Sequence, residues 1–438
     1  MHNNRTTSAP SANAMRIETL IPALGFLAIL LALLAPRTTP ALLALLTVPA
    51  LLAAILRNQL ERARTITPLE AILACLGLYL ALNATWSVDK SEAFGRLALF
   101  VIFALTSILA FPAYKALEAD TRRRLQIAIL VAFGIGAAAL AIECAFNQPV
   151  RRWILSTAPL LRPSAKHLHV MGNEVTRIGL DILNRNVAML MLILWPAIIM
   201  LRAIVSDTSR SLLWIGALGL VSAVAVFTSE HQTSMIAIIA SLLVFLGMKV
   251  APRTMKLLVL AGWITATVLV VPIASTCYSA GLYKAGWIPE TGRNRIVLWG
   301  VTAQRIQRSP ILGIGIKSIK PLDEAAAETA LWPKDHPYPL RTGRHSHNIF
   351  MQTWFELGAV GAAFLLAIGL ATFAIFQKRS SALQPYLYSS FTATTVIGAF
   401  SWGLWQPWFM AAFAIWAVLL LLAGIGPRTD QPASSSTA

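Results

Sequence analysis

The sequence predicts an all-α fold, a polytopic bundle of helices that cross a membrane. Hydrophobic residues make up 57% of the 438 residues, charged residues only 13%, and the mean hydropathy is +0.66. Soluble domains carry far more charge. Apolar stretches of about 17 to 25 residues recur along the chain, and each is long enough to cross a hydrocarbon core of roughly 30 Å as a helix. Because backbone groups cannot bond to water inside the bilayer, helices are the expected spanning element.

Twelve stretches are predicted to span the membrane. They cover residues 18–35, 40–56, 69–86, 97–112, 125–145, 183–201, 212–228, 234–248, 257–276, 348–376, 387–405 and 408–425. Residues 18–425 thus form one predicted transmembrane domain with two long loops, at about 146–182 and 277–347, the larger one between the ninth and tenth spans. Residues 1–17 form an N-terminal tail. Residues 426–438, rich in Ser, Thr and Pro, form a C-terminal tail that is predicted to be disordered.

Basic residues in the short loops predict the direction in which the chain crosses. The loops after the second, fourth, sixth, eighth and tenth spans carry Lys and Arg, which mark the cytoplasmic side. These residues are Arg57, Arg62, Arg64, Lys115, Arg122, Arg123, Arg124, Arg202, Arg210, Lys249, Arg253, Lys256, Lys378 and Arg379. Both tails are then cytoplasmic, and the loops 146–182 and 277–347 face the periplasm.

The charge balance of the chain is strongly basic. There are 36 Lys and Arg against 19 Asp and Glu, a formal net charge of +17. In a membrane protein such an excess binds anionic membrane lipids, so nucleic acid is not implied as a partner. The loop 277–347 is itself basic, and two interpretations of it are open. It is an ordinary solvated surface, since long loops escape the charge rule, or it is a site for a lipid-linked phosphate or pyrophosphate, which arginine binds bidentately.

Candidate catalytic residues gather between residues 291 and 361. The segment contains, in order, Arg293-Asn294-Arg295, Trp299, Pro310-x-x-Gly313-x-Gly315, His345-Ser346-His347-Asn348 and, after nine residues, Gly358-x-x-Gly361. An imidazole titrates near neutral pH and can accept a proton from a hydroxyl group. The sequence has no Walker loop, dinucleotide fingerprint or paired-aspartate metal motif, so no cofactor and no metal are expected.

This order and spacing resemble the O-antigen ligase and O-antigen polymerase superfamily. Its members carry an Arg four residues before a Trp, a Pro-x-x-Gly-x-Gly turn and a His-Asn-x9-Gly-x-x-Gly signature after a large periplasmic loop, and the last signature most resembles the ligase branch. Ala362 departs from the Thr or Tyr that ligases usually place there. Asn184-Arg185-Asn186 resembles the Asn-x-Asn element of the family. Near His231, members often have Ser-x-Arg, so no role is carried onto this histidine.

The resemblance implies a GT-C-like glycosyltransferase, inverting and metal-independent. It would transfer O-antigen polysaccharide from undecaprenyl diphosphate to the lipid A-core acceptor, at the periplasmic face of the inner membrane of a Gram-negative bacterium. His347 is the expected general base or acceptor-orienting group, and Arg185 and Arg295 are the expected clamp on the diphosphate. Three further residues are expected to bind substrate: Arg293, His345 and Asn348. Arg293 competes with Arg295 for the clamp, because the two share a face in an extended segment but not in a helix.

Other functions stay open from sequence alone. An O-antigen polymerase and a protein O-oligosaccharyltransferase would share the donor chemistry, and a transporter of lipid-linked sugar belongs to a different class. Transporters of that class are expected to show internal repeats with broken helices. The predicted charges instead gather at one face. Two further expectations concern packing: Glu356, inside the tenth span, pairs with a loop arginine, and Gly358, Gly361 and Gly369 let helices approach closely.

Overall fold

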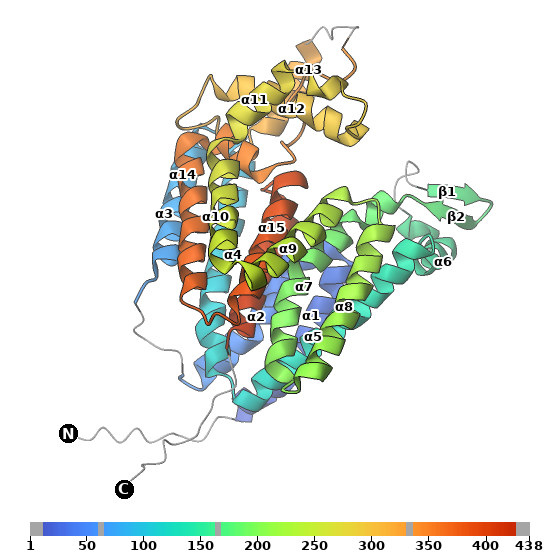
Figure 1. The fold of residues 1–438 in the computed structure, drawn as a ribbon, viewed down its shortest axis with the longest axis vertical. Coiled ribbons are helices and arrows are strands. Elements are labelled where there is room, and N and C mark those ends of the chain that lie inside the picture. The colour runs from blue at the N-terminus through green and yellow to red at the C-terminus, as the bar shows by residue number, and fades with distance from the viewer. Residues whose placement is uncertain (1–11, 60–64, 163–167, 330–335, 426–438) are drawn as a thin grey trace. The chain divides into compact units, whose positions relative to one another are not determined.

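The computed structural model describes residues 12–59, 65–162, 168–329 and 336–425 (Figure 1). The predicted C-terminal tail, and residues 1–11 of the predicted N-terminal tail, lie outside the described residues. Contacts divide the chain into two compact units. The first comprises residues 1–64, 106–230 and 414–438, and the second comprises residues 65–105 and 231–413. Two helices, α4 (Lys90–Ala116) and α16 (Pro407–Ala423), are divided between the units.

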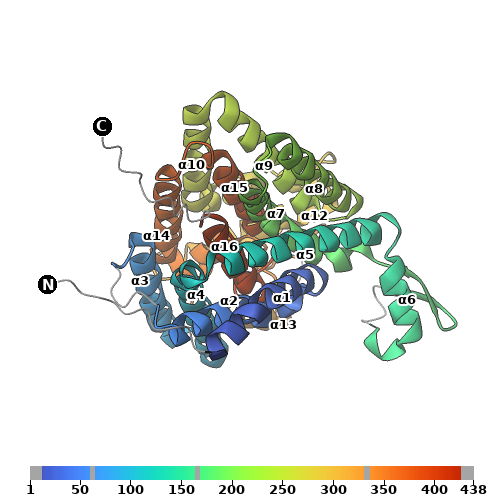
Figure 2. The same cartoon turned by 90° about the horizontal axis from the view of Figure 1, so that it is seen from below.

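The first unit is built around a central apolar helix. Its helices are α1 (Ala12–Leu34), α2 (Thr39–Leu56), α5 (Ala119–Ala145), α6 (Pro149–Thr157), α7 (Asn184–Ile204) and α8 (Thr208–Thr228). Every residue of α7 from Asn186 to Leu201 is buried. A helix that is apolar on all sides is expected in the middle of a bundle. Helices α1 and α5 pack side by side, and both contact α7 (Figure 2).

A β-hairpin interrupts the otherwise helical chain. Strands β1 (Leu168–Met171) and β2 (Glu174–Ile178) pair antiparallel, with Met171 opposite Glu174. The two residues between them, Gly172 and Asn173, make the turn, and Gly172 has a φ of +60°. Glycine adopts this conformation without steric cost. The predicted loop at about 146–182 thus contains a short hairpin, and the other regular elements in the described residues are helices.

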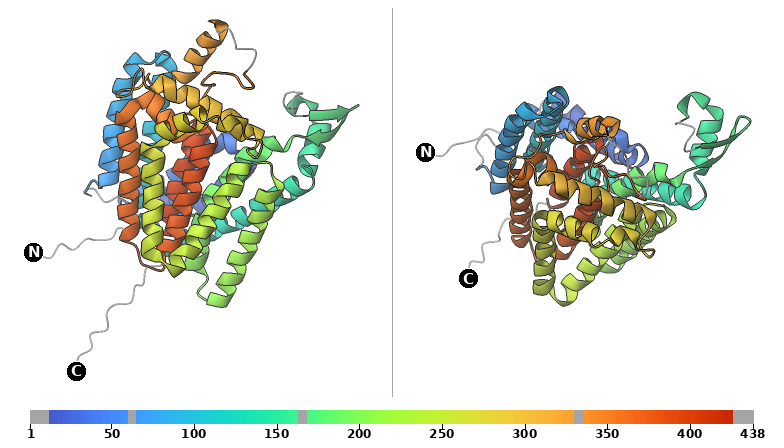
Figure 3. Two further views of the ribbon diagram at one scale, coloured as in Figure 1. Left: turned by 45° about the horizontal axis from the view of Figure 1, so that its top comes forward. Right: turned by 90° about the horizontal axis from the view of Figure 1, so that it is seen from above.

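The second unit carries most of the large loop predicted between the ninth and tenth spans. Its helices are α3 (Pro68–Asn83), α9 (Gln232–Val250), α10 (Pro252–Val268), α11 (Val270–Ser279), α12 (Glu290–Ile306), α13 (Ile319–Thr329), α14 (Ile349–Gln377) and α15 (Gln384–Phe400). Helices α11, α12 and α13 lie across one end of α10, α14 and α15 (Figures 1 and 3). A buried apolar cluster holds them there. It consists of Ala274, Ala303, Ile306, Ile319, Met351 and Phe355. The predicted loop is therefore largely helical and is anchored to the start of α14.

The structure confirms a polytopic helical membrane protein. Among the described residues, nine helices are long and apolar enough to cross a membrane. A tenth span results if α10 and α11, which are bent by 70° at their junction, are counted as one. The predicted ninth span, 257–276, crosses this bend. Helices α15 and α16 lie at the last two predicted spans, but each has only 17 residues. The total of twelve therefore stays a prediction.

Helix α14 is broken at Gly358, which has φ +64° and ψ −162°. The turn from Pro310 to Gly315 lies against the break and supplies the missing hydrogen bonds. The N–H of Ala359 donates to the Pro310 carbonyl at 2.8 Å, and the N–H of Gly315 donates to the Glu356 carbonyl at 3.0 Å. A Cβ on Gly358 would lie 2.3 Å from the Ile311 carbonyl oxygen. Only glycine fits this backbone, so the expectation that Gly358 serves helix packing was wrong.

The other packing expectations had mixed outcomes. A Cβ on Gly369 would overlap the indole of Trp263 on α10, which confirms that Gly369 allows close helix approach. The side chain nearest to a Cβ added at Gly361 would be that of Leu357, which belongs to the same helix. The pairing expected for Glu356 was wrong, because no ion pair of Glu356 occurs in the described part of the chain. Its carboxylate accepts hydrogen bonds from Gln352, Trp405 and the Ile319 N–H instead.

Candidate active site

Helix α12 positions Arg295 and Trp299 on one face. Residues four apart in an α-helix lie one above the other, whereas Arg293, two residues before Arg295, points in a different direction. The Trp299 indole N–H donates to the Ser346 carbonyl at 2.6 Å, between the two histidines of the His345–Asn348 segment. This bond ties the α12 face that carries Arg295 to the histidine segment. In the helix, Arg293 and Arg295 therefore point in different directions, and which of them binds the diphosphate stays a prediction.

Arg295 is the charged centre of this region. Its guanidinium acts electrostatically on three histidines of the second unit, His231, His345 and His347. Burial lowers the pKa of Arg295 itself, but a guanidinium stays protonated in proteins. Arg293 has a different environment, because its buried Nε has no hydrogen-bond partner among the residues that the structure describes. Of the two arginines, Arg295 is the one that the fold brings to the histidines.

The tautomer of His347 is defined by one hydrogen bond. Its Nδ1 lies 2.7 Å from the carbonyl oxygen of Ser401. Because a carbonyl can only accept, Nδ1 carries the proton, and Nε2 of the neutral ring is left with a free lone pair. The backbone of His347 has a φ of +52°, a left-handed conformation that is uncommon for a residue with a Cβ. The chain thus holds this imidazole in an orientation with a basic Nε2.

The pKa of His347 favours the same form. Burial lowers this pKa below its ordinary value, the hydrogen bond to Ser401 raises it in part, and the positive charge of Arg295 lowers it further. A lowered pKa means that the neutral imidazole prevails at neutral pH. A neutral histidine with a free Nε2 can accept a proton from a hydroxyl group.

His345 lies beside His347, with the ring centroids 4.1 Å apart. Burial, followed by the charges of His347, Lys317 and Arg295, lowers the pKa of His345 to about 3. Its buried Nδ1 has no hydrogen-bond partner within the described ranges. A neutral ring with an unsatisfied polar atom can bond to a bound sugar or acceptor hydroxyl, so substrate binding by His345 stays a prediction.

His231 is the residue that sequence reasoning left without a role. It precedes α9, is 7% exposed, and its Nδ1 lies 2.7 Å from the Ser234 hydroxyl oxygen. The ring stacks on Trp402, with the ring centroids 5.2 Å apart. Burial and the charge of Arg295 lower its pKa to about 3. The signal that could have identified His231 is its position, where members of the resembled superfamily often carry arginine.

Asn348 has a structural task. Its Oδ1 accepts from the backbone N–H groups of Phe350 at 2.9 Å and of Met351 at 3.0 Å, which makes it the N-cap of α14. Asparagine is among the best residues for this position. The cap fixes where α14 begins and therefore where His347 ends the preceding loop. Substrate contact by Asn348 stays a prediction for its amide nitrogen.

Helix α3 supports the turn at the Gly358 break from a distant part of the sequence. Asn83, fully buried, donates through Nδ2 to the Leu312 carbonyl at 3.1 Å and accepts at Oδ1 from the Ile316 N–H at 2.7 Å. The Tyr79 hydroxyl donates to the Leu357 carbonyl at 2.8 Å. These bonds satisfy carbonyls freed by the irregular backbone. No sequence motif around Tyr79 and Asn83 predicts this role.

Arg185 belongs to the first unit, at the beginning of α7. Arg37 lies near enough for its charge to act on Arg185. The neighbouring Asn186 is buried and donates to the carbonyls of Leu33 at 2.6 Å and Leu34 at 2.9 Å, so it bonds α7 to the end of α1. The second asparagine of the Asn-x-Asn element, Asn186, thus has a structural role. A role for Arg185 in a diphosphate clamp stays a prediction.

No cluster of three or more His, Cys, Asp or Glu side chains is arranged to hold a metal ion within the described residues. The three cysteines, Cys75, Cys144 and Cys277, are free thiols.

Known proteins are similar to this chain in the region that forms the site. Residues 216–366, which include Arg295, His345 and His347, match the family model described as O-antigen ligase. A protein of Rickettsia felis named "Putative polysaccharide ligase" is 28% identical over 254 residues, 57% of this chain and 60% of that protein. A Rickettsia typhi protein of the same description is 27% identical over 256 residues, 58% of this chain and 61% of that protein. The match thus spans about three-fifths of the length of these relatives.

A more distant relative has a different description. The exopolysaccharide production protein ExoQ of Rhizobium meliloti is 28% identical over 171 residues, 37% of this chain and 38% of that protein. The family match begins in α8 and ends in α14, so it contains the helix that carries Arg295, the turn at the Gly358 break and the histidine segment. Through residues 216–366, the chain is similar to the O-antigen ligase family.

Proposed function

We propose that the protein is an O-antigen ligase, which transfers O-antigen polysaccharide from undecaprenyl diphosphate to the lipid A-core oligosaccharide. The reaction would take place at the periplasmic face of the inner membrane of a Gram-negative bacterium. One observation carries this proposal: His347 is held as a neutral ring with a free Nε2, and the guanidinium of Arg295 acts on the same ring. A base beside a cation is what transfer from a lipid diphosphate to a hydroxyl requires.

The proposed reaction is a single displacement that inverts the anomeric centre. The acceptor hydroxyl oxygen attacks the anomeric carbon of the polymer, and the bond from that carbon to the diphosphate oxygen breaks. The hydroxyl proton passes to Nε2 of His347. Negative charge grows on the leaving diphosphate, where Arg295 would stabilise it, and the sequence pattern around Arg185 assigns that residue the same task. Because the diphosphate is already a good leaving group, the proposed displacement needs no metal.

The second candidate function is polymerisation, in which lipid-linked repeat units are joined on the same carrier. The similarity to an exopolysaccharide production protein favours it. Ala362, where ligases usually have Thr or Tyr, also weakens the choice of ligase over polymerase. Donor chemistry is common to ligation and polymerisation, so the acceptor alone distinguishes them.

A transfer assay tests the proposal. Purified protein in nanodiscs receives polymer-bearing undecaprenyl diphosphate and lipid A-core, and full-length lipopolysaccharide is measured. His347→Ala is expected to lower the rate by about 10²- to 10⁴-fold because it removes the proton acceptor. Arg295→Ala is expected to lower it by about 10²- to 10³-fold because it removes charge stabilisation. Arg308→Ala is the matched control, since Arg308 is an exposed arginine just beyond the end of the same helix.

The outcomes separate the candidate functions. Lengthening of the lipid-linked glycan with no use of lipid A-core would establish the polymerase instead. Absence of any covalent product with either acceptor would contradict both, and would direct the search to a protein acceptor or to transport of the lipid-linked sugar.

A further inference from the structure

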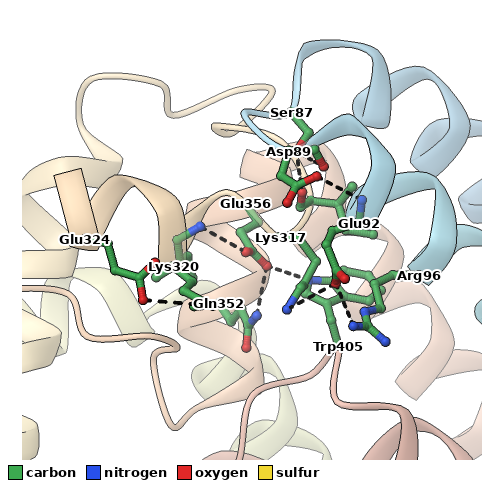
Figure 4. Close-up of polar contacts among 12 residues, drawn as sticks. Ser87, Asp89, Glu92, Arg96, Lys317, Lys320, Glu324, Gln352, Glu356 and Trp405 are labelled. Atoms are coloured by element: carbon green, nitrogen blue, oxygen red, sulfur yellow. Dashed lines mark hydrogen bonds and ion pairs between the residues drawn. The ribbon is translucent and has the colours of Figure 1, made fainter.

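A buried carboxylate lies in α14 two turns after the candidate base. Glu356 is 1% exposed, and its oxygens accept from the Gln352 amide at 2.9 Å, from the Trp405 indole N–H and from the Ile319 N–H at 3.4 Å (Figure 4). The nearby cation, Lys317, forms its ion pair with Glu92 instead, at 3.9 Å. Burying a carboxylate is costly, so we expect it to have a task.

The partners of Glu356 hold one turn of backbone, residues 401–406, between α15 and α16. Gln352 donates to Glu356 through Nε2, which leaves its Oε1 to accept from the Leu404 N–H at 2.8 Å. Glu356 thereby decides which way the Gln352 amide points. Trp405 belongs to the same turn and is fastened to the carboxylate directly. Two adjacent residues of this turn, Leu404 and Trp405, are therefore anchored to Glu356.

The same turn contacts both histidines of the candidate site. Its first residue, Ser401, offers the carbonyl that fixes the His347 tautomer. Gly403 lies against His345, since a Cβ on Gly403 would be 2.8 Å from the His345 Cβ. A displacement of Leu404 or Trp405 would move Ser401 and Gly403, because they lie within four residues of one another in the turn.

We propose that Glu356 is a positioning residue, which acts through Gln352 and Trp405 on the 401–406 turn and so keeps His347 in the tautomer with a free Nε2. Glu356 does not exchange protons with substrate, because it is fully enclosed. This inference rests on the proposed function in one respect, the role of His347 as the base. The contacts of Glu356 do not depend on the reaction.

The test compares Glu356→Gln with Trp405→Phe. Glu356→Gln keeps the size of the side chain, whereas Trp405→Phe removes the indole N–H and leaves a smaller aromatic ring; each removes part of the network. Transfer by either variant is expected to fall by about 10- to 100-fold in kcat, as for other residues that orient a catalytic group, with the donor KM near the wild-type value. Because both act through one turn, the double variant should lose less than the product of the two single effects. Glu92→Gln is the control, since Glu92 lies in the neighbouring exposed ion pairs.

A second readout does not depend on activity. Diethyl pyrocarbonate modifies unprotonated imidazole, and tandem mass spectrometry of the peptide reports the rate at His347 as a function of pH. In both variants the rate should change several-fold, and its pH midpoint should shift, while Glu92→Gln matches the wild type. Unchanged labelling in Glu356→Gln and Trp405→Phe would overturn the proposal, as would a loss of activity that only follows a loss of folded protein in thermal unfolding. Altered labelling in a protein that transfers nothing would uphold the positioning role and defeat the proposed function.

Discussion

The break in α14 gives the most quantitative prediction. Gly358→Ala places a methyl group where the backbone has φ +64° and ψ −162°, a conformation open essentially to glycine alone. The new Cβ would lie 2.3 Å from the Ile311 carbonyl oxygen and 2.6 Å from the Gly313 nitrogen. Both atoms belong to the backbone, so the overlap can be relieved only by moving the turn from Pro310 to Gly315 away from the helix.

The cost follows from these contacts. Forcing alanine into this conformation costs about 2 kcal/mol. Moving the turn breaks the hydrogen bonds from Ala359 N–H to Pro310 and from Val360 N–H to Ile311, 2.8 and 3.2 Å long, each with a net contribution of about 1 kcal/mol. We expect the second unit to lose about 4 kcal/mol in its free energy of unfolding. For a unit of this size that corresponds to a fall of about 10 °C in Tm.

Thermal unfolding in nanodiscs measures this effect. Gly262→Ala is the matched control, because Gly262 lies within α10 and a Cβ there would meet nothing within 4 Å. Alanine at an ordinary helical position stabilises by up to about 1 kcal/mol, so the control should melt at or slightly above the wild-type temperature. A Gly358→Ala protein that melts within a degree or two of the wild type would refute the reasoning.

Three further predictions concern the site. The active form of His347 is the neutral one and its pKa is lowered from the ordinary 6.5, so kcat/KM for transfer should fall on the acid side with a midpoint below pH 6.5. Arg295→Gln should move this midpoint to higher pH, and a wild-type midpoint above pH 6.5 would contradict the prediction. Asn348→Ala should lower the free energy of unfolding by about 1 kcal/mol, because the N-cap of α14 is lost. Asn348→Asp keeps the cap oxygen and should not lower it. Equal melting temperatures of the two variants would contradict this prediction. Asn83→Leu should cost about 1–3 kcal/mol, because it leaves the buried N–H of Ile316 unpaired. Urea unfolding that matches the wild type would exclude this.

The site residues that could be predicted from the sequence share one property: their side chains are charged or titratable in a chain that is mostly apolar. His347 and Arg295 stand in a basic segment of a chain that is otherwise apolar, and a regular spacing joins Arg295 to Trp299 and Asn348 to Gly358. Such signals are local. Their structural basis is also local, since Arg295 and Trp299 share a helix face and Asn348 caps the helix that Gly358 interrupts.

The supporting residues could not be found in this way. Asn83 bonds to Leu312 and Ile316, more than 200 positions away, and its surroundings in α3 are those of any apolar helix. Glu356 was expected to find an arginine, because a buried carboxylate needs a partner. In the structure, its carboxylate accepts hydrogen bonds from two neutral side chains and a backbone N–H instead. Which donors lie near Glu356 depends on how α14 and the 401–406 turn pack.

The sequence by itself determined the class of the protein and the candidate catalytic residues. Hydropathy decides the class because the bilayer accepts only chains whose backbone polar groups are paired internally, and motif spacing identifies residues whose geometry is set within one or two helical turns. The tertiary structure decided the tautomer of His347, the placement of Arg295 near the histidines, the place of His231 and the role of Gly358. Each of these depends on contacts between segments far apart in the chain, and no local pattern of residues encodes the distance between them.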